Sequence, residues 1–360
     1  MKFLVIRFKE IGDAILSLPV CTSLKKSFPG AQVDYLVYEH VAPLFEGHPD
    51  VDHVLTITRS ERDHPLQYLK KMLWLRRQRY DAVFDLITLP ASAAITYLSG
   101  AKRRVGFDHK KNRSFLYETR VPHPVTGNSI TAKLALLEGF GGKLVLDASF
   151  PRLSLREEEL RAMDRRIAAA GIDRARPVFA FAVYSRDDFK RWPPEYFVEV
   201  IERCLERYGA QAVMIWGPGE GDYVRAVAAC VRQMASVFTV IETRDLRELA
   251  ALLAHCDLFI GNDGGPRHVA EGVGLPTLSI YSPVFEKGGW LPTPGPRHRG
   301  LDVTDVLGIS REEHKARVPE FRERLWEYYR RITPEMALRE IEQLVRQLSR
   351  SMNCRGGLRG

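Results

Sequence analysis

The sequence predicts an α/β protein with two doubly wound, Rossmann-like domains. In both halves of the chain, short apolar runs alternate with helical patterns, and this alternation is typical of βαβ units in a parallel sheet. The length of 360 residues also favours two domains. Hydrophobic residues make up 45% and charged residues 27% of the chain, which excludes a disordered or collagen-like protein.

In the first half, an apolar run that ends before a glycine predicts a buried strand leading into a helix. The expected strands are Lys2–Arg7, Val33–Tyr38, Val51–Ile57 and Ala82–Leu86. A helix is expected over His64–Arg79, with apolar spacing at Leu66, Leu69, Leu73 and Trp74. Pro19 falls inside the first helical pattern and should kink it there.

The second half repeats the alternation of strands and helices. Its expected strands are Val178–Val183, Ala212–Trp216, Val237–Ile241, Asp257–Gly261 and Thr277–Tyr281. The expected helices are Leu155–Ala170, Pro194–Tyr208, Asp222–Met234, Leu246–His255, a short one from Pro266, and a final one over Thr333–Ser349. Two such domains would turn the carboxyl ends of their strands toward a cleft, where open α/β sheets bind ligands.

Cysteine usage and hydropathy suggest a soluble cytoplasmic protein. The five cysteines are scattered, without the spacing of a zinc site. The apolar run at the N-terminus stops at Arg7, unlike a signal peptide. The longest stretch without charged side chains is too short for a membrane-spanning helix.

The net charge of +8 is concentrated in two segments. Arg59–Arg79 and Lys102–Arg120 each hold seven basic and two acidic residues. Such patches attract nucleic acid, a phosphorylated glycolipid or an acidic membrane surface, although a solvated face would have the same composition.

The first candidate site is the segment RFKEIGD, at the turn after the first strand. Gly12 would let the backbone turn tightly and a ligand approach it. Asp13 would then stand at or near a helix N-terminus, either as an N-cap or as a functional carboxylate. The helix dipole and the nearby Arg7 should keep Asp13 ionised, as a general base must be.

Two loops in the second half could bind an anion. In YSRDDFKRWPPEYF, Ser185, Arg186 and Lys190 follow a strand, where a lysine suits a phosphate, although a solvated basic turn is the alternative. In FIGNDGGPRHVAEGVGLP, a strand ends before a glycine-rich loop, and Pro266 starts a helix whose N–H groups would bind a phosphate or pyrophosphate. The residues of interest in this second loop are Asp263, Gly264, Gly265 and His268.

A further glycine-rich loop, WGPGEGD, superficially matches a dinucleotide fingerprint. Its glycines are evenly spaced, and Asp222 takes the place of the third required glycine, so nicotinamide binding is not favoured. Glu220 could accept hydrogen bonds from ribose hydroxyls, or it could be an exposed loop acid.

These four segments, in this order, make the chain similar to the heptosyltransferases of glycosyltransferase family 9. The resemblance implies a GT-B fold, with an acceptor-binding domain at 1–172, a nucleotide-sugar-binding domain at 173–330, a helix at 331–350 that crosses back to the first domain, and a flexible tail at 351–360. It also implies inverting transfer of heptose from ADP-heptose to a lipopolysaccharide inner-core acceptor of the lipid A–Kdo type.

The resemblance implies a role for each matching residue. Asp13 would be the general base, and Lys190 would bind the donor phosphates and support catalysis. The other donor-binding positions are Gly12, Ser185, Arg186, Glu220, Asp263, Gly264, Gly265 and His268. The chain departs from the family pattern where Gly264-Gly265 replaces a Ser/Thr-Gly pair and where Arg267 replaces an apolar residue.

We expect no metal and no cofactor, because cationic side chains and loop amides would stabilise the leaving diphosphate. An anionic glycolipid acceptor would be drawn to Arg59, Arg62, Arg104 and Arg113, and peripheral contact with the inner membrane surface is compatible with this charge. One alternative is a family 9 enzyme with another sugar nucleotide or acceptor. The remote alternative is a non-catalytic protein that binds anions or nucleic acid; no nucleic-acid-binding motif supports it, so we expect no nucleic-acid partner.

Overall fold

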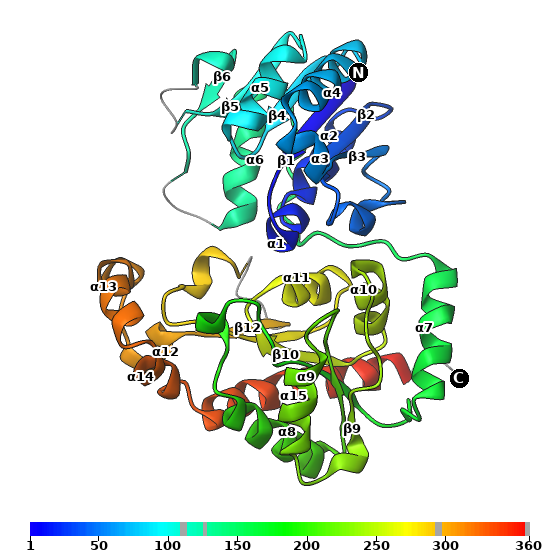
Figure 1. The fold of residues 1–360 in the computed structure, drawn as a ribbon, viewed down its shortest axis with the longest axis vertical. Helices are drawn as coiled ribbons and strands as arrows, with labels where there is room; N and C mark the ends of the chain where they lie inside the picture. The colour runs from blue at the N-terminus through cyan, green and yellow to red at the C-terminus, as the bar shows by residue number, and fades with distance from the viewer. Residues whose placement is uncertain (109–113, 125–127, 292–296, 357–360) are drawn as a thin grey trace. The chain divides into compact units, whose positions relative to one another are not determined.

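The computed structural model describes residues 1–108, 114–124, 128–291 and 297–356 (Figure 1). The chain folds into two units, Met1–Ser154 and Leu155–Gly360. Within the described residues, no helix is both long and apolar enough to cross a lipid bilayer.

The first unit contains a parallel sheet of six strands among its described residues. In the order β3-β2-β1-β4-β5-β6, the strands are His53–Ile57, Gln32–Tyr38, Lys2–Arg7, Ala82–Asp85, Arg103–Phe107 and Thr119–Val121. The four strands expected from the sequence are present. The sequence analysis missed β5 and β6, because exposed arginines interrupt their apolar pattern.

The helices of this unit are α1 (Ile11–Ile15), α2 (Leu18–Ser27), α3 (Arg59–Asp63), α4 (Pro65–Arg77), α5 (Pro90–Leu98) and α6 (Ser129–Phe140). The helical pattern is interrupted between α1 and α2, and Pro19 lies in the first turn of α2. The expected interruption at this proline is therefore confirmed, since a proline fits the first turn of a helix but not its interior.

An aromatic cluster joins β1 to the elements around it. The ring of Phe3 lies 5.2 Å from that of Phe28 at the C-cap of α2, 6.1 Å from Phe84 on β4 and 6.0 Å from Phe140 on α6. Residues 3–6 of β1 are fully buried. This agrees with the continuous apolar run of its sequence, which is expected for a strand covered on both faces.

The helix expected over His64–Arg79 forms as α4, but its apolar spacing does not face the core. Its buried residues are Met72 and Leu75. The apolar positions singled out in the sequence are exposed: Leu66, Leu69, Leu73 and Trp74. The helix therefore carries apolar side chains on two faces, and the described part of the chain covers only one of them.

The second unit contains another parallel sheet, again of six strands in its described part. In the order β12-β11-β10-β7-β8-β9, the strands are His298–Leu301, Thr277–Ile280, Leu258–Asn262, Val178–Ala182, Gln211–Met214 and Val237–Phe238. The predicted strands are all present, β9 is shorter than expected, and β12 was not anticipated.

The helices of the second unit are α7 (Glu157–Ala169), α8 (Pro194–Tyr208), α9 (Gly221–Ala229), α10 (Leu246–Ala254), α11 (Gly265–Gly272), α12 (Val303–Leu307), α13 (Arg311–Glu323), α14 (Leu325–Arg330) and α15 (Pro334–Gly356). Figure 1 shows α10 and α11 on one face of the sheet and α8 and α15 on the other. The core on the α8 side includes Phe197, Cys204 and Ile341.

The units divide earlier in the chain than the boundary at 172/173 expected from the sequence. Helix α7 belongs to the second unit, where Arg166 Nη1 lies 3.0 Å from Glu248 Oε2 on α10. Arg247 Nε also donates to Glu159 Oε1 across 2.8 Å. These ion pairs join residues far apart in the sequence, so local patterns do not reveal them.

Helix α15 packs within the second unit, against α8, β11 and β12. Arg299 Nη1, on β12, lies 2.5 Å from Glu340 Oε2. The helix continues to Gly356, into the segment 351–360 assigned to a flexible tail, and residues 357–360 lie outside the described part. The return of the final helix to the first domain remains a prediction.

We predict that Gly261→Ala lowers the free energy of unfolding by about 1–3 kcal/mol, the usual cost of overpacking. A Cβ at Gly261 would stand 2.8 Å from the Ala182 carbonyl oxygen on β7, and backbone cannot easily move away. Urea unfolding measures the effect. Gly264→Ala is the matched control, because its Cβ would meet only Pro266 Cδ, at 3.9 Å; equal stability of both variants would contradict this packing argument.

Candidate active site

In the first unit, the candidate catalytic residues lie at or just beyond the carboxyl ends of β1 and β4. These neighbouring strands continue to opposite sides of the sheet, and such switch points are where open α/β sheets bind ligands. Arg7 ends β1, and its guanidinium donates to the Leu86 carbonyl beyond β4 and to the Asp13 carboxylate. Arg7 therefore connects both strands and orients Asp13.

Asp13 is not the N-cap of its helix, so the capping interpretation is wrong. Glu10 occupies the N-cap of α1, and Asp13 lies within the first turn with a side chain that is 13% exposed. Gly12 is buried in the same turn and is not among the glycines of positive φ. The tight turn expected at Gly12 is therefore not found.

A second cation, missed in the sequence, approaches Asp13 from α6. Lys133 Nζ lies 4.0 Å from Asp13 Oδ1, donates to Ser129 Oγ, and belongs to a side chain that is 4% exposed. The signal was a lysine on the apolar side of a helix, because its neighbours Ile130, Leu134 and Leu137 are all buried.

Arg7 and Lys133 determine the protonation state of Asp13. Burial alone would raise the pKa of Asp13, but the Coulombic attraction of Arg7 and Lys133 and the hydrogen bond from Arg7 lower it overall. Asp13 is therefore ionised at neutral pH, as expected. Burial, and then repulsion by Arg7, hold the pKa of Lys133 well below its usual value, against the attraction of Asp13.

In the second unit, the Lys190 loop and the Asp263 loop are brought to one sheet edge. They follow β7 and β10, which are neighbours at the switch point of this sheet. Asn262 joins them: its Oδ1 accepts from the Trp192 amide across 2.9 Å, and its Nδ2 donates to the Val183 carbonyl across 2.9 Å. Sequence reasoning missed Asn262, although it directly precedes the glycine-rich loop.

The loop after β10 leads into the N-terminus of α11. Gly264 is the N-cap and Gly265 the first helical residue, with Pro266 in the first turn. The φ of Gly264 is 176°, an extended conformation that any residue adopts, so the backbone of this loop does not require a glycine there. Because Gly264 and Gly265 have no side chains, the start of α11 stays accessible to a ligand. The N–H groups of the first turn have no partner within the helix and can bind an anion there.

Arg267 binds the acidic side chains near the start of α11. It is fully buried, and its guanidinium donates to Asp263 Oδ1 at 3.0 Å, to Glu271 Oε1 at 2.8 Å and to His268 Nε2 at 2.8 Å. Burial would lower the pKa of Arg267, but Glu271 and then Tyr281 and Asp263 raise it. The guanidinium therefore stays charged and holds three side chains of the predicted donor segment.

His268 is part of this network. Its Nε2 accepts from Arg267, and its Nδ1 lies 3.6 Å from Glu271 Oε2, with the side chain 5% exposed. Both ring nitrogens therefore face protein groups. Asp263 keeps a side chain that is 14% exposed at the edge of the sheet.

Lys190 lies at the mouth of the loop after β7. Its Nζ is 3.1 Å from Asp187 Oδ2 and 5.3 Å from the centre of the Phe285 ring, and its side chain is 25% exposed. Arg186 is exposed, and the carbonyl of Ser185 accepts from Arg191 Nε across 2.6 Å. The loop thus presents two cations near a backbone that is held in place.

The remaining donor and acceptor candidates are distributed over both units. Glu220 is the N-cap of α9, and its Oε2 accepts from the Gly217 amide across 3.0 Å. Arg59 and Arg62 are on α3, where both pair with Asp63. Arg104 is opposite Val83 in the sheet register and donates to the carbonyls of Leu116 and Ala101. Arg113 lies outside the described residues.

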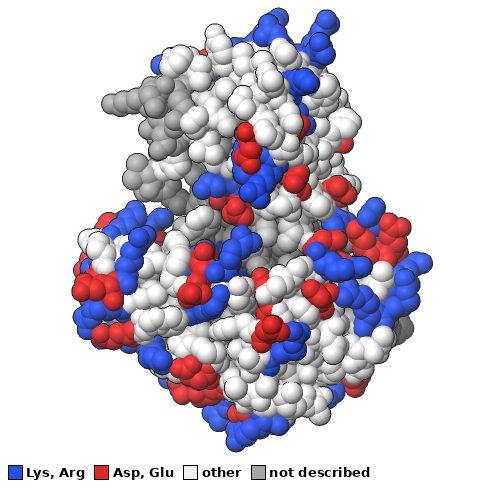
Figure 2. All heavy atoms as spheres, viewed as in Figure 1, with Lys and Arg blue, Asp and Glu red and all other residues white. Residues whose placement is uncertain are grey.

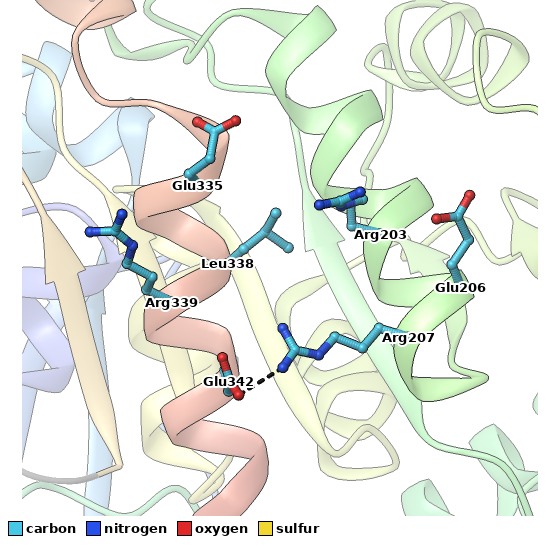
Figure 3. A pocket seen from close by; sticks show the side chains of 7 residues that line it. All are labelled: Arg203, Glu206, Arg207, Glu335, Leu338, Arg339 and Glu342. Atoms are coloured by element: carbon cyan, nitrogen blue, oxygen red, sulfur yellow. Dashed lines mark hydrogen bonds and ion pairs between the residues drawn. The ribbon is translucent and has the colours of Figure 1, made fainter.

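A groove of about 520 Å³ lies elsewhere in the second unit, between α8 and α15 (Figure 3). Three arginines and three glutamates line it, and Arg207 Nη2 is paired with Glu342 Oε1 across 2.7 Å. Its charges balance, and no candidate site residue belongs to it. In the ranges that the structure describes, no group of three or more His, Cys, Asp or Glu could hold a metal ion.

Solved structures share this fold. The chain aligns with the glycosyl transferase family 9 protein of Veillonella parvula with a TM-score of 0.84 and 21% identity, covering 96% of this chain and 97% of that one. For the Escherichia coli ADP-heptose lps heptosyltransferase II, the TM-score is 0.73 at 20% identity, with 96% and 99% covered. The two Rossmann-like sheets thus have the GT-B fold of these neighbours, which confirms the expected fold class.

The family follows from the sequence itself. The family model of glycosyltransferase family 9 (heptosyltransferase) matches residues 69–287, and the chain belongs to this family. It is 28% identical to lipopolysaccharide heptosyltransferase 3 of Escherichia coli over 284 residues, which cover 75% of this chain and 80% of that protein. It is 29% identical to lipopolysaccharide heptosyltransferase 1 of Pseudomonas aeruginosa over 294 residues, with 79% of each covered.

We predict a pH-dependent difference in stability between the wild type and Lys133→Met. The pKa of Lys133 is lowered in the folded state, so the unfolded state binds more protons between that pKa and about 10.4. In this window the wild type should gain stability relative to the variant as pH rises, by at most about 1.4 kcal/mol per pH unit.

Urea unfolding of both proteins from neutral pH to about pH 10 measures this difference. Groups common to both proteins cancel in the comparison. Parallel pH profiles would mean that Lys133 keeps an ordinary pKa in the folded protein.

Proposed function

We propose that this protein transfers heptose from ADP-heptose to an anionic lipopolysaccharide inner-core acceptor, with inversion at the anomeric carbon. The names of its relatives support heptose transfer to lipopolysaccharide. One similar solved structure is an Escherichia coli heptosyltransferase with ADP-2-deoxy-2-fluoro heptose, which supports an ADP-linked donor. The reaction would take place in the cytoplasm.

The environment of Asp13 is the observation that carries the catalytic proposal. The acceptor oxygen bonds to the anomeric carbon, the bond from that carbon to the diphosphate breaks, and the hydroxyl proton passes to Asp13. Arg7 and Lys133 keep this carboxylate deprotonated at every physiological pH. A weak base suffices, because the hydroxyl becomes strongly acidic once its oxygen begins to bond to carbon.

The second unit would hold the donor at its switch point. Lys190 and Arg186 supply positive charge from the loop after β7, and the amides at the start of α11 supply hydrogen-bond donors. Together they would stabilise the negative charge that develops on the departing diphosphate. We propose that the transfer needs no metal ion, because these groups provide that stabilisation.

Two features favour a second candidate, a family 9 transferase that uses another sugar nucleotide. Gly264 offers no hydroxyl at the start of α11, and His268 is buried with its Nε2 hydrogen-bonded to Arg267. A donor panel of ADP-heptose, UDP-glucose and GDP-mannose, measured by calorimetry, separates the two candidates. Preference for UDP-glucose or GDP-mannose would keep the fold and the base but change the donor.

The acceptor would be attracted by the basic side chains of the first unit. Arg59 and Arg62 lie together on α3, which follows β3, and we propose that they and Arg113 meet its phosphates and carboxylates. Arg104 is held by two backbone carbonyls, so its contribution would be to the shape of the unit and to long-range attraction.

We predict that Asp13→Asn reduces the transfer rate by about 10²–10⁴ and leaves ADP binding unchanged. The amide cannot accept the hydroxyl proton, whereas the nucleotide would bind to the other unit. Product formation is measured by mass spectrometry and ADP affinity by calorimetry. Full activity in the variant would remove Asp13 from the reaction, and loss of ADP affinity would indicate a folding defect instead.

We predict that Lys190→Ala weakens ADP binding and lowers kcat by about 10²-fold or more, since the ammonium would stabilise the leaving phosphate. Steady-state kinetics and calorimetry give both values. Lys315→Ala, at an exposed position of α13, is the control and should resemble the wild type. Unchanged ADP affinity and kcat in Lys190→Ala would place the diphosphate elsewhere.

A further inference from the structure

Helix α4 exposes an apolar stripe that no described part of the chain covers. Leu66, Leu69 and Leu73 are spaced for one face of a helix, and they are 75%, 44% and 50% exposed. The opposite face is anchored in the core by Met72 and Leu75. The leucines are therefore not needed to attach α4 to its unit.

Basic side chains border this stripe. At 100° per residue, Lys70 and Arg77 fall on one side of the leucines and Arg76 on the other. No Asp or Glu occurs between His64 and Tyr80 in the sequence. Figure 2 shows Lys and Arg side chains gathered at the end of the first unit where Figure 1 draws α4.

Aromatic side chains stand beside the same surface. Trp74 is 41% exposed, with the Lys71 ammonium 5.5 Å from its ring. Tyr97 is 52% exposed on the adjacent α5, and the Arg104 guanidinium lies 5.8 Å from its ring. Tryptophan and tyrosine next to cations are characteristic of the boundary between lipid headgroups and acyl chains.

We propose that α4 lies on the surface of an anionic lipid bilayer. The stripe of Leu66, Leu69 and Leu73 enters the boundary between headgroups and acyl chains, and Lys70, Arg76 and Arg77 meet lipid phosphates. This inference uses α4 and its neighbours alone and is independent of the proposed heptose transfer.

The arrangement of leucines and cations argues against two other occupants of this surface. A second copy of the chain, packed through the same face, would place Lys70 and Arg77 against their own counterparts, without acidic residues on α4 to neutralise them. A nucleic acid would pair with the cations but leave the leucines in water. An anionic bilayer, with charged headgroups above an apolar interior, satisfies both kinds of side chain.

The test is flotation of the full-length protein with vesicles. We expect binding to vesicles of phosphatidylglycerol and phosphatidylethanolamine, and little binding to phosphatidylcholine alone. Leu69→Ser/Leu73→Ser should weaken binding about tenfold or more, because buried apolar area is lost. Lys70→Glu/Arg77→Glu should weaken it to a similar degree and make the remaining binding less sensitive to salt.

Matched controls distinguish binding through the α4 surface from nonspecific binding to vesicles. Val240→Ser removes an aliphatic side chain of the second unit that is 68% exposed, and Lys315→Glu reverses an exposed charge on α13. Both should bind vesicles like the wild type. All variants should retain the ADP affinity of the wild type, which shows that they are folded and separates this test from the proposed reaction.

Several outcomes would overturn the proposal. Absence of vesicle binding by the wild type would do so, as would binding that the leucine and charge variants leave unchanged. Dimerisation that Leu69→Ser/Leu73→Ser abolishes, without vesicle binding, would assign the stripe to a second copy of the chain. Absence of ADP binding by the wild type, with intact vesicle binding, would contradict the donor assignment and leave the proposed membrane surface in place.

Discussion

Both sheets are buried on both faces, and this constraint determines where the protein can place polar chemistry. The central strands β1, β7 and β10 are almost entirely buried, so charged groups have no room along them. At a switch point, however, two neighbouring strands lead to opposite sides of the sheet, and the backbone there leaves space at the carboxyl edge. Arg7 in one unit and Asn262 in the other occupy these positions and bind across them.

The two switch points are built for different tasks. In the first, Arg7, Asp13 and Lys133 are largely buried and directly adjacent. Removing Asp13 would leave the two cations without a counter-ion in a buried site, so this carboxylate is what allows Arg7 and Lys133 to lie here together. In the second, Lys190 and the start of α11 remain open to a ligand, while the buried guanidinium of Arg267 holds the acids behind them.

The sequence was most informative where local pattern and tertiary environment coincide. Buried parallel strands such as β1 and β7 have continuous apolar runs, and the interruption at Pro19 follows from proline chemistry. Asp13 and Lys190 were proposed as site residues from the sequence because each follows such a strand. Lys133 was missed, because its proximity to Asp13 depends on how α6 packs near α1. The place of α7 in the second unit was missed for a similar reason, since it depends on ion pairs with α10 between distant segments.

The sequence correctly predicts helix α4 but does not determine which face of the helix packs against the sheet. Spacing of Leu66, Leu69 and Leu73 predicts an amphipathic helix, and Tyr68, Met72 and Leu75 predict one equally well on the opposite side. The unit buries the second set, against β4 and α5 through residues such as Val83 and Ile95. A helix needs one apolar face to attach to its sheet, so a second face adds nothing to folding and carries the risk of aggregation. Its occurrence beside Lys70, Arg76 and Arg77 is explained by the proposed contact with an anionic bilayer.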